Sequence, residues 1–314
     1  MFTTAEVQSI RLFLKKGLLF SIPFLFYAAL LVAVDPFNYF GVSPLINDAH
    51  KRATASKLHY TLWKTIDFLR DPRPNLILGD SRMGQIQAAR VEEVTGDRYY
   101  NFSYGGGTIP ELIDTFYFAT RHVKVERVYI GASFINFNAF QNRNRFRESQ
   151  SILANPLLYL VNRIVLKAAY HAVRAQWMGE TIDVERPNED RDAFWNHQLG
   201  TAIVSHYGRF KYSHAYVESL RELARYCDAN GIALTFLIPP THVELQAKIA
   251  EFGLSAEAEE FNRDLHSLGR VVDMDFDNAF TRDRENFLDP FHTANGDVVR
   301  GQLWGDHPNP AIQR

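Results

Sequence analysis

The sequence predicts an α/β domain built on a five-stranded parallel sheet, preceded by one apolar helix that crosses a membrane. Two observations carry this prediction. From residue 75 to residue 276, short apolar runs that end in turn signals alternate with helical patterns, and this alternation favours a parallel sheet covered by helices on both faces. Ahead of these runs, residues 17–34 contain no charged side chain.

The bulk composition narrows the class of protein. At 314 residues and 46% hydrophobic, the chain can bury one substantial core. Its 34 basic and 36 acidic residues leave a net charge of −2, which argues against a nucleic-acid partner. The single cysteine, Cys227, excludes an intrachain disulfide, and we expect it to be buried. No group of residues has metal-ligand spacing, so we expect neither a metal nor another cofactor.

The uncharged segment 17–34 has the length of a membrane span. At ~1.5 Å per residue it forms ~27 Å of helix, against a hydrocarbon core of ~30 Å. Pro23 would kink an isolated helix, but kinks of this kind are tolerated in membranes. A buried core helix would carry polar residues on one face, and a cleaved signal peptide would have a shorter apolar core with a small-x-small cleavage site. We therefore expect a retained anchor.

The flanking charges predict the orientation of this anchor. Arg11, Lys15 and Lys16 precede the apolar segment, and Asp35 follows it. By the positive-inside rule we expect residues 1–16 to be cytoplasmic and the residues after the span to lie outside. We expect a single-pass protein of the cell inner membrane with a periplasmic, or otherwise extracytoplasmic, C-terminal domain.

The remaining chain divides into a neck at residues 35–71 and a domain at residues 72–314. The neck contains a helical pattern over Ala49–Trp63. The predicted elements of the domain are five strands, at Leu76–Leu78, Tyr99–Phe102, Arg127–Ile130, Ala233–Ile238 and Val271–Phe276, and three helices, at Glu111–His122, Ser213–Ala229 and Glu257–Leu268.

An insertion without strands interrupts this order at about residues 140–210. It begins with a basic, Asn-rich stretch, continues with a helix from Ser151 to about Gln176, and that helix has one strongly apolar side. Two interpretations stay open: the insertion packs on the domain, or its apolar side docks on the membrane or on a membrane partner.

The first strand leads directly into Gly79-Asp80-Ser81. In parallel α/β sheets, residues that follow a strand lie at the carboxyl edge, where ligands usually bind. Gly79 permits a sharp turn there, and Ser81 would begin a helix whose free N–H groups favour a developing negative charge. Alternatively, Asp80 or Ser81 only caps that helix, a role compatible with catalysis.

Two further motifs complete a candidate catalytic site. Three glycines, Gly105 to Gly107, follow the second strand and could place a backbone N–H near a reacting oxygen. Asp289 and His292 follow the last strand. Ser81 would be the nucleophile, His292 the general base, and Asp289 the group that orients the imidazole. His242, after the fourth strand, would either line the cleft or lie exposed on a loop. The glycine spacing does not fit a nucleotide-binding motif.

Gly79-Asp80-Ser81, a glycine after the second strand, and Asp289-x-x-His292 together resemble the SGNH (GDSL-like) hydrolase superfamily from about Asn75 to Gly305. The resemblance implies a flavodoxin-like three-layer α/β/α domain, a catalytic triad of Ser81, Asp289 and His292, and a glycine of the second motif in the oxyanion hole. An α/β-hydrolase fits less well, because Met83 replaces the second glycine of its Gly-x-Ser-x-Gly turn.

The third motif departs from the family pattern Gly-x-Asn-Asp. Here Gly131 is followed by Ala-Ser-Phe-Ile-Asn-Phe-Asn, so Ser133 occupies the place of the oxyanion-binding asparagine. Ser133, Asn136 and Asn138 are the candidate replacements. The predicted oxyanion hole comprises Ser81, Gly106, Gly107 and Asn136.

An anchored, exported domain of this type resembles the accessory proteins of cell-envelope acylation, such as alginate acetylation and teichoic-acid D-alanylation. The resemblance implies a polysaccharide substrate and a membrane-bound O-acyltransferase as partner. Three hypotheses follow: an O-acyltransferase or esterase that works through acyl-Ser81, a non-catalytic scaffold of an acyltransferase complex, and a stand-alone exported carbohydrate esterase or lipase.

Overall fold

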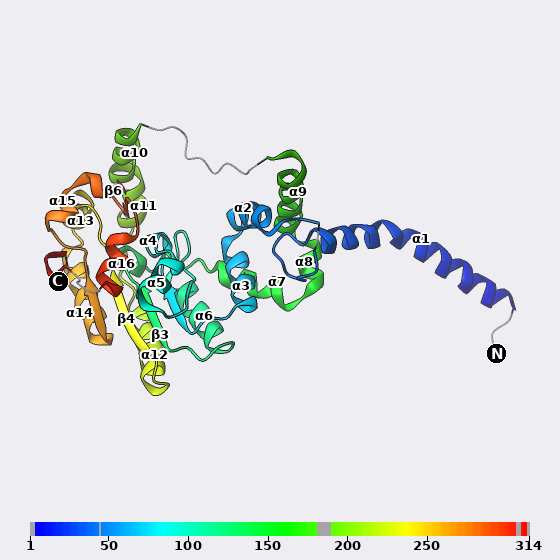
Figure 1. The fold of residues 1–314 in the computed structure, drawn as a ribbon, viewed down its shortest axis with the longest axis horizontal. Coiled ribbons are helices and arrows are strands. Elements are labelled where there is room, and N and C mark those ends of the chain that lie inside the picture. Colours follow the sequence, from blue (N-terminus) through cyan, green and yellow to red (C-terminus); the bar gives the residue numbers. More distant parts are fainter. Residues whose placement is uncertain (1–3, 44, 181–189, 306–308, 313–314) are drawn as a thin grey trace. The chain divides into compact units, whose positions relative to one another are not determined.

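The computed structural model describes residues 4–43, 45–180, 190–305 and 309–312 (Figure 1). The chain divides into two compact units. The first, which we call the anchor unit, consists of Met1–Asp67 and Ser149–Val184. The second, the sheet unit, consists of Phe68–Glu148 and Glu185–Arg314.

The sheet unit contains a five-stranded sheet in which all paired strands are parallel. The strand order is β2-β1-β3-β4-β5, the flavodoxin-like order. This confirms the predicted fold class. The strands are β1 (Asn75–Leu78), β2 (Tyr99–Asn101), β3 (Arg127–Gly131), β4 (Ala233–Ile238) and β5 (Arg270–Asp273).

Helices cover both faces of this sheet. On one face Ile77, Leu237 and Val272 form a buried cluster with Val91 of α5 (Ala88–Thr95) and Trp304 of α16 (Asp297–Trp304). The second layer consists of α6 (Ile109–Thr120), α12 (His214–Ala229) and α14 (Ser255–Leu268), of which α12 contacts both neighbours. Because the strands are buried on both faces, they appear in the sequence as continuous apolar runs.

Shorter elements complete the sheet unit. An antiparallel hairpin of β6 (Phe287–Asp289) and β7 (His292–Thr293) follows the sheet. The shorter helices are α4 (Ser81–Gly84), α13 (Val243–Glu251), α15 (Ala279–Arg282), α10 (Arg191–His197) and α11 (Ile203–Tyr207), with a π-helical turn at Gln198–Ala202 and a 3₁₀ turn at Phe134–Phe137.

The anchor unit begins with α1 (Thr4–Val34), which continues through Pro23 without a break. Its segment Gln8–Val34 is long and apolar enough to cross a membrane, with a mean hydropathy of 2.3 over its most apolar 18 residues. Only 11% of that window is buried, so α1 is not a core helix. Most large apolar side chains along it are exposed, for example those of Phe20 and Phe26.

The predicted helix over Ala49–Trp63 is wrong in one respect, because the chain breaks it at His59. α2 (Asp48–Leu58) ends there, and α3 (Tyr60–Arg70) begins directly after it. The backbone of His59 leaves the helical conformation, and its Nδ1 accepts a hydrogen bond of 3.1 Å from the Leu62 N–H. His59 thus takes the part of an N-cap, for which histidine is a weak sequence signal.

The single helix predicted from Ser151 to Gln176 is also wrong. The structure contains α7 (Arg145–Ala154), α8 (Pro156–Val161) and α9 (Arg163–Met178) instead. Asn155 caps α8 by accepting from the Leu157 N–H at 2.9 Å, and Asn162 caps α9 by accepting from the Ile164 N–H at 2.8 Å. Asparagine is a preferred N-cap residue, and Pro156 takes the first helical position, which proline favours.

A buried carboxylate joins the two sequence segments of the anchor unit. Asp35 accepts hydrogen bonds from the N–H groups of Tyr39, Phe40 and Gly41 at 2.7, 3.0 and 2.9 Å. It also accepts from the hydroxyl of Tyr159 at 3.1 Å. Residues 149–184, predicted as part of an insertion in the C-terminal domain, are therefore grouped with the residues that follow α1. The predicted domain limits themselves stay predictions.

Candidate active site

Ser81 lies at the carboxyl edge of the sheet, where β1 turns into α4. The turn requires glycine at position 79, whose φ is +151°. A Cβ there would lie 2.7 Å from Cγ of Met83 and 3.2 Å from the carbonyl oxygen of Gly131. Asp80 caps α4, with its Oδ1 accepting from the Arg82 N–H at 3.0 Å. The structure thus shows that Asp80 caps the helix that Ser81 begins, whereas the catalytic role of Ser81 stays a prediction.

Ser81, His292 and Asp289 form a connected chain of hydrogen bonds. The Ser81 Oγ lies 2.7 Å from Nε2 of His292, and Nδ1 of His292 lies 2.9 and 3.0 Å from the two oxygens of Asp289. Asp289 is buried and also accepts from the N–H groups of Phe291 and His292, at 2.9 and 3.1 Å. The carboxylate thus assigns the proton to Nδ1 and leaves Nε2 free to accept the serine proton.

The glycine loop approaches the first motif closely. A Cβ on Gly107 would lie 2.7 Å from the carbonyl oxygen of Gly79 and 3.0 Å from that of Tyr104. Gly106 has a φ of +58°. The N–H of Gly107 donates to the Tyr104 carbonyl at 2.9 Å, whereas the N–H of Gly106 has no partner among the described residues. Gly106 is therefore the better backbone donor for an oxyanion.

An ion pair holds this loop in place. Arg145 Nε and Nη2 donate to the two oxygens of Glu111 at 2.6 and 2.7 Å. The same guanidinium donates to the carbonyl oxygens of Gly105 and Gly106 at 2.9 and 3.2 Å. Glu111 also belongs to the capping box of α6, together with Thr108. Arg145, which lies in the Asn-rich stretch, thus positions the glycine loop. The sequence pattern did not predict this role.

Of the three candidates in the third motif, Asn136 alone lines the cleft at Ser81. Its Nδ2 donates to Asp80 Oδ2 and to the Gly107 carbonyl, both at 3.3 Å. The hydroxyl of Ser133 is buried without a hydrogen bond in a small separate cavity. The amide of Asn138 donates to the His206 carbonyl at 2.9 Å. Ser133 stands where the family pattern has its asparagine, and Asn136 follows three residues later. A 3₁₀ turn aligns positions three residues apart, so the amide of Asn136 can lie near the place of the missing asparagine.

Asp80 and Arg82 form a buried ion pair beside Ser81, with Nε of Arg82 3.1 Å from each carboxylate oxygen. Both residues are 6% exposed. Burial alone raises the pKa of Asp80, but the adjacent Arg82 outweighs it and holds that pKa below its ordinary value. The carboxylate therefore stays ionised and can orient the Asn136 amide. Sequence reasoning missed this pair, although both residues adjoin the nucleophile.

The cleft at Ser81 has a volume of about 140 Å³. Gln198, directly after α10, and His206, within α11, contribute to its wall. The Gln141 amide lies 2.9 Å from Nδ1 of His206. Burial and the charge of Arg82 lower the pKa of His206, which favours its neutral form. The full set of lining residues is Asp80, Ser81, Arg82, Gly106, Gly107, Ile135, Asn136, Gln141, Gln198, His206, Phe291 and His292.

His242 matches neither of its expected placements. It is buried, caps α13, and does not line the cleft. Its ring contacts Trp195 and Phe287, with centroid distances of 4.9 and 5.6 Å. The cap explains its position, because Nδ1 accepts from the Glu244 N–H at 3.3 Å.

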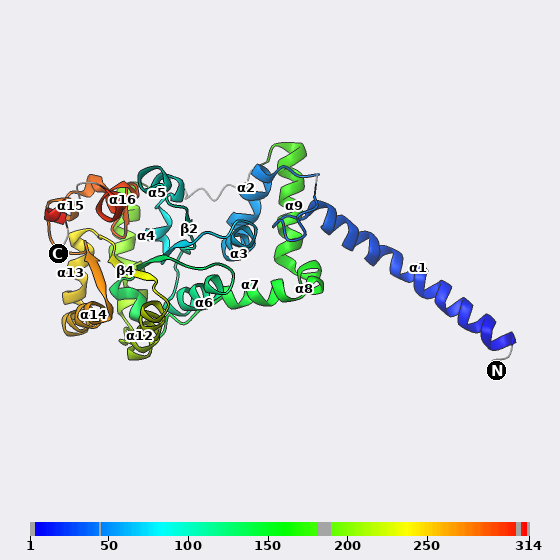
Figure 2. The same ribbon diagram turned by 60° about the horizontal axis from the view of Figure 1, so that its bottom comes forward.

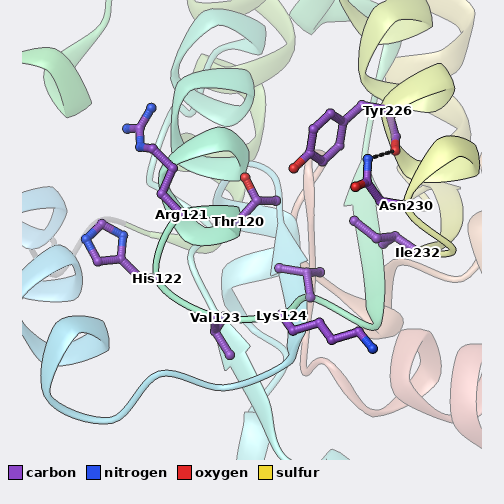
Figure 3. A pocket seen from close by; sticks show the side chains of 9 residues that line it. Thr120, Arg121, His122, Val123, Lys124, Tyr226, Asn230 and Ile232 are labelled. Carbon is purple, nitrogen blue, oxygen red and sulfur yellow. Dashed lines mark hydrogen bonds between the residues drawn. The ribbon is translucent and has the colours of Figure 1, made fainter.

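A second, larger hollow of about 500 Å³ lies where α6 and α12 end (Figure 3). It is lined by the basic side chains of Arg121, His122 and Lys124, and on the other side by Tyr226 and Asn230. These helices end before β3 and β4 begin, so the hollow lies toward the amino edge of the sheet, away from Ser81. Its described lining contains no serine or cysteine beside a base.

Comparison with known proteins gives little information about the role of this site. No protein-family model and no curated protein matches the chain. Among solved structures, a Bacteroides fragilis NCTC 9343 protein provisionally described as an acylhydrolase has 12% identity and a TM-score of 0.39, covering 79% of this chain and 93% of its own. A Streptococcus pneumonia protein provisionally described as a platelet activating factor has 11% identity and a TM-score of 0.36, covering 77% and 86%. Similarity this low says nothing about substrate or mechanism, so the function proposed below rests on the site geometry.

Proposed function

We propose that the protein is a membrane-anchored, extracytoplasmic acyl-transfer enzyme of the SGNH type. It would form an acyl-Ser81 intermediate and pass the acyl group to a hydroxyl of an envelope or secreted polysaccharide, or to water. The observation that carries this proposal is the chain of hydrogen bonds from Ser81 through His292 to Asp289 at the carboxyl edge of the sheet.

The geometry supports a two-step reaction. In the first step Oγ of Ser81 attacks the acyl carbonyl carbon while its proton passes to Nε2 of His292, which then protonates the leaving alcohol. In the second step His292 takes a proton from the acceptor hydroxyl, which attacks the acyl carbon, and Oγ regains its proton. The Gly106 N–H would stabilise the oxyanion of both tetrahedral intermediates, and the Asn136 amide would do so by exchanging its 3.3 Å hydrogen bond to the Gly107 carbonyl for one to the oxyanion.

The dimensions of the cleft favour a short acyl group. Its volume of about 140 Å³ lies well below the ~300–1,000 Å³ of pockets that enclose drug-sized ligands. Amide and imidazole groups of Gln141, Gln198 and His206 line it, and such groups suit the hydroxyls of a sugar. The polymer would therefore remain outside, with only the reacting hydroxyl and the acyl group entering.

Packing within the anchor unit favours a retained anchor over a cleaved signal peptide. Leu31 and Val34, in the last turns of α1, are buried in a cluster with Ile46 and two alanines of α9. Cleavage after the apolar segment would remove both side chains from that cluster. With Arg11, Lys15 and Lys16 on the cytoplasmic side, the catalytic unit would lie outside the inner membrane.

An acyl-enzyme experiment tests the proposed function. The full-length protein in lipid nanodiscs is mixed with nitrophenyl acetate and quenched, and its peptides are analysed by mass spectrometry. We expect an acetyl group on the peptide that contains Ser81. Adding a soluble polysaccharide should accelerate loss of this acetyl group and yield O-acetylated polymer, because the acceptor hydroxyl competes with water.

The outcomes separate the alternatives. Rapid release of acetate without any acceptor would favour a stand-alone esterase. Absence of both an acetyl group on Ser81 and release of acetate, in a protein that is folded by circular dichroism, would contradict catalysis and favour a scaffold in an acyltransferase complex.

A second test concerns the oxyanion hole. Asn136→Ala is expected to lower kcat by ~10²–10³-fold, the usual cost of removing one oxyanion donor, with little change in KM. The measurement is steady-state turnover of nitrophenyl acetate. Ser133→Ala is the matched control, because its hydroxyl is buried without a partner, and it should retain wild-type turnover. A larger loss of turnover in Ser133→Ala than in Asn136→Ala would show that Asn136 is not the oxyanion donor.

A further inference from the structure

The short helix α8 exposes an apolar surface next to the membrane helix. Its sequence, Pro-Leu-Leu-Tyr-Leu-Val, contains no charged residue. Leu157, Leu158 and Val161 are 69%, 45% and 68% exposed. Three large aliphatic side chains on one six-residue helix form an apolar patch that a water-exposed surface would normally avoid.

Contacts within the anchor unit fix α8 beside the C-terminal end of α1. The hydroxyl of Tyr27 donates to the Leu160 carbonyl at 2.8 Å, and both side chains pack on the cluster that contains Leu31 and Val34. From the other side of α8, Tyr159 is buried and donates to Asp35, directly after α1. In both views α8 lies at this end of α1 (Figures 1 and 2).

The length of the span sets the depth of α8. Lys16 marks the cytoplasmic end, and the ~27 Å of helix from Gly17 to Val34 barely match a hydrocarbon core of ~30 Å. The last two turns of α1 must therefore lie within the hydrocarbon region. Leu160 packs against these turns, so α8 lies at the same depth.

We infer that α8 is embedded in the outer leaflet of the membrane, where lipid acyl chains surround Leu157, Leu158 and Val161. This inference rests on the membrane anchoring proposed above. Lipid, rather than a partner protein, is the occupant because α8 packs against the last turns of α1, a helix that itself exposes large apolar side chains along its length.

The termini of α8 are compatible with this environment. Unsatisfied backbone groups are costly in hydrocarbon, and the side chains of Asn155 and Asn162 bond N–H groups at the starts of α8 and α9. Arg163 and Lys167, on the following helix, are exposed. Their long side chains can extend to the lipid headgroups. The anchor unit would thus be attached to the membrane at two places.

Fluorescence of labelled full-length protein tests this inference. Single cysteines replace Leu157 or Val161 on α8, Leu25 on α1 as the positive control, and Val94 on α5, an exposed valine, as the control in water. Each is labelled with the environment-sensitive dye NBD in nanodiscs, with or without lipids that carry a doxyl quencher on the acyl chain. The unaltered chain is the blank, since its only cysteine, Cys227, is buried.

We expect the labels at Leu157→Cys and Val161→Cys to emit at shorter wavelength than the Val94→Cys label, and to be quenched to an extent comparable with the Leu25→Cys label. Quenching at Leu25→Cys but not on α8 would overturn the inference and leave the anchor intact. Absence of quenching at all sites would overturn the anchoring itself. Shielding of the α8 labels only after native membrane proteins are added would show that a protein covers the patch, which also contradicts the inference.

Discussion

Ser81→Ala is expected to abolish covalent labelling by a fluorophosphonate and to lower turnover of acyl esters by ~10⁶-fold, the loss found when a catalytic serine is removed. The reason is that its Oγ is the group placed 2.7 Å from Nε2 of His292. The variant should fold normally, because it loses one hydrogen bond worth ~0.5–1.5 kcal/mol. Labelling is measured on the full-length protein by gel fluorescence, and turnover by release of nitrophenol.

Ser133→Ala serves as the control for this prediction. Its hydroxyl is in a cavity next to the cleft and forms no hydrogen bond, so labelling should persist. Equal labelling of the wild-type protein and of Ser81→Ala would show that Ser81 is not the nucleophile. A loss of polysaccharide acylation in cells that express Ser81→Ala would link the chemistry to the proposed substrate.

Asp289→Asn is expected to lower kcat by ~10⁴-fold, as in triads where the same change reverses the imidazole tautomer. Oδ1 of Asp289 accepts from two backbone N–H groups, and an asparagine oxygen can keep these bonds. Its NH₂ group would then face Nδ1 of His292 and require that nitrogen to accept. The proton would move to Nε2, which could no longer accept from Ser81. Turnover and the thermal midpoint are the measurements.

Two further variants separate the effect of Asp289 on the orientation of the His292 imidazole from its effect on folding. Asp283→Asn makes the same chemical change at the exposed N-cap of the 3₁₀ turn Arg284–Asn286, just before β6. This variant should retain full activity. Asp289→Ala leaves two backbone N–H groups without their acceptor, so it should also lower the free energy of unfolding, by ~1–3 kcal/mol for each group. Near-wild-type turnover by Asp289→Asn would exclude Asp289 as the orienting residue.

Local patterns predicted much of the sheet unit. Each strand is a short apolar run that ends in a turn signal, and parallel strands buried on both faces require such runs. The same patterns placed Ser81 after β1 and the glycine loop after β2, and strands of one parallel sheet bring both to one edge. The triad joins residues 211 positions apart. Its prediction depended on the resemblance to a known family, because spacing along the chain does not encode that contact.

Local signals were also overlooked where they were present. Asn155 followed by Pro156, and Asn162, are ordinary N-cap patterns, and they divide the predicted helix into the three helices α7, α8 and α9. The prediction followed the continuous apolar pattern instead. The capping role of His59 had no comparable signal, because histidine seldom takes that position. The structure also places Asn136 in the cleft through one 3₁₀ turn, which the sequence left open among three residues.

By itself the sequence determined the class of fold, the apolar helix at the amino end, and the residues that meet at the carboxyl edge of the sheet. Hydrophobic periodicity and turn chemistry act between near neighbours, so they can be read along the chain. Tertiary structure alone decided that Arg145 holds the glycine loop, that Arg82 keeps Asp80 ionised, and that Tyr159 joins α8 to Asp35. The ion pair of Asp80 with Arg82 and the bond of Tyr159 to Asp35 are contacts between buried polar groups, and Arg145 reaches the glycine loop from a distant segment; the folded chain, not the local sequence, sets these partners.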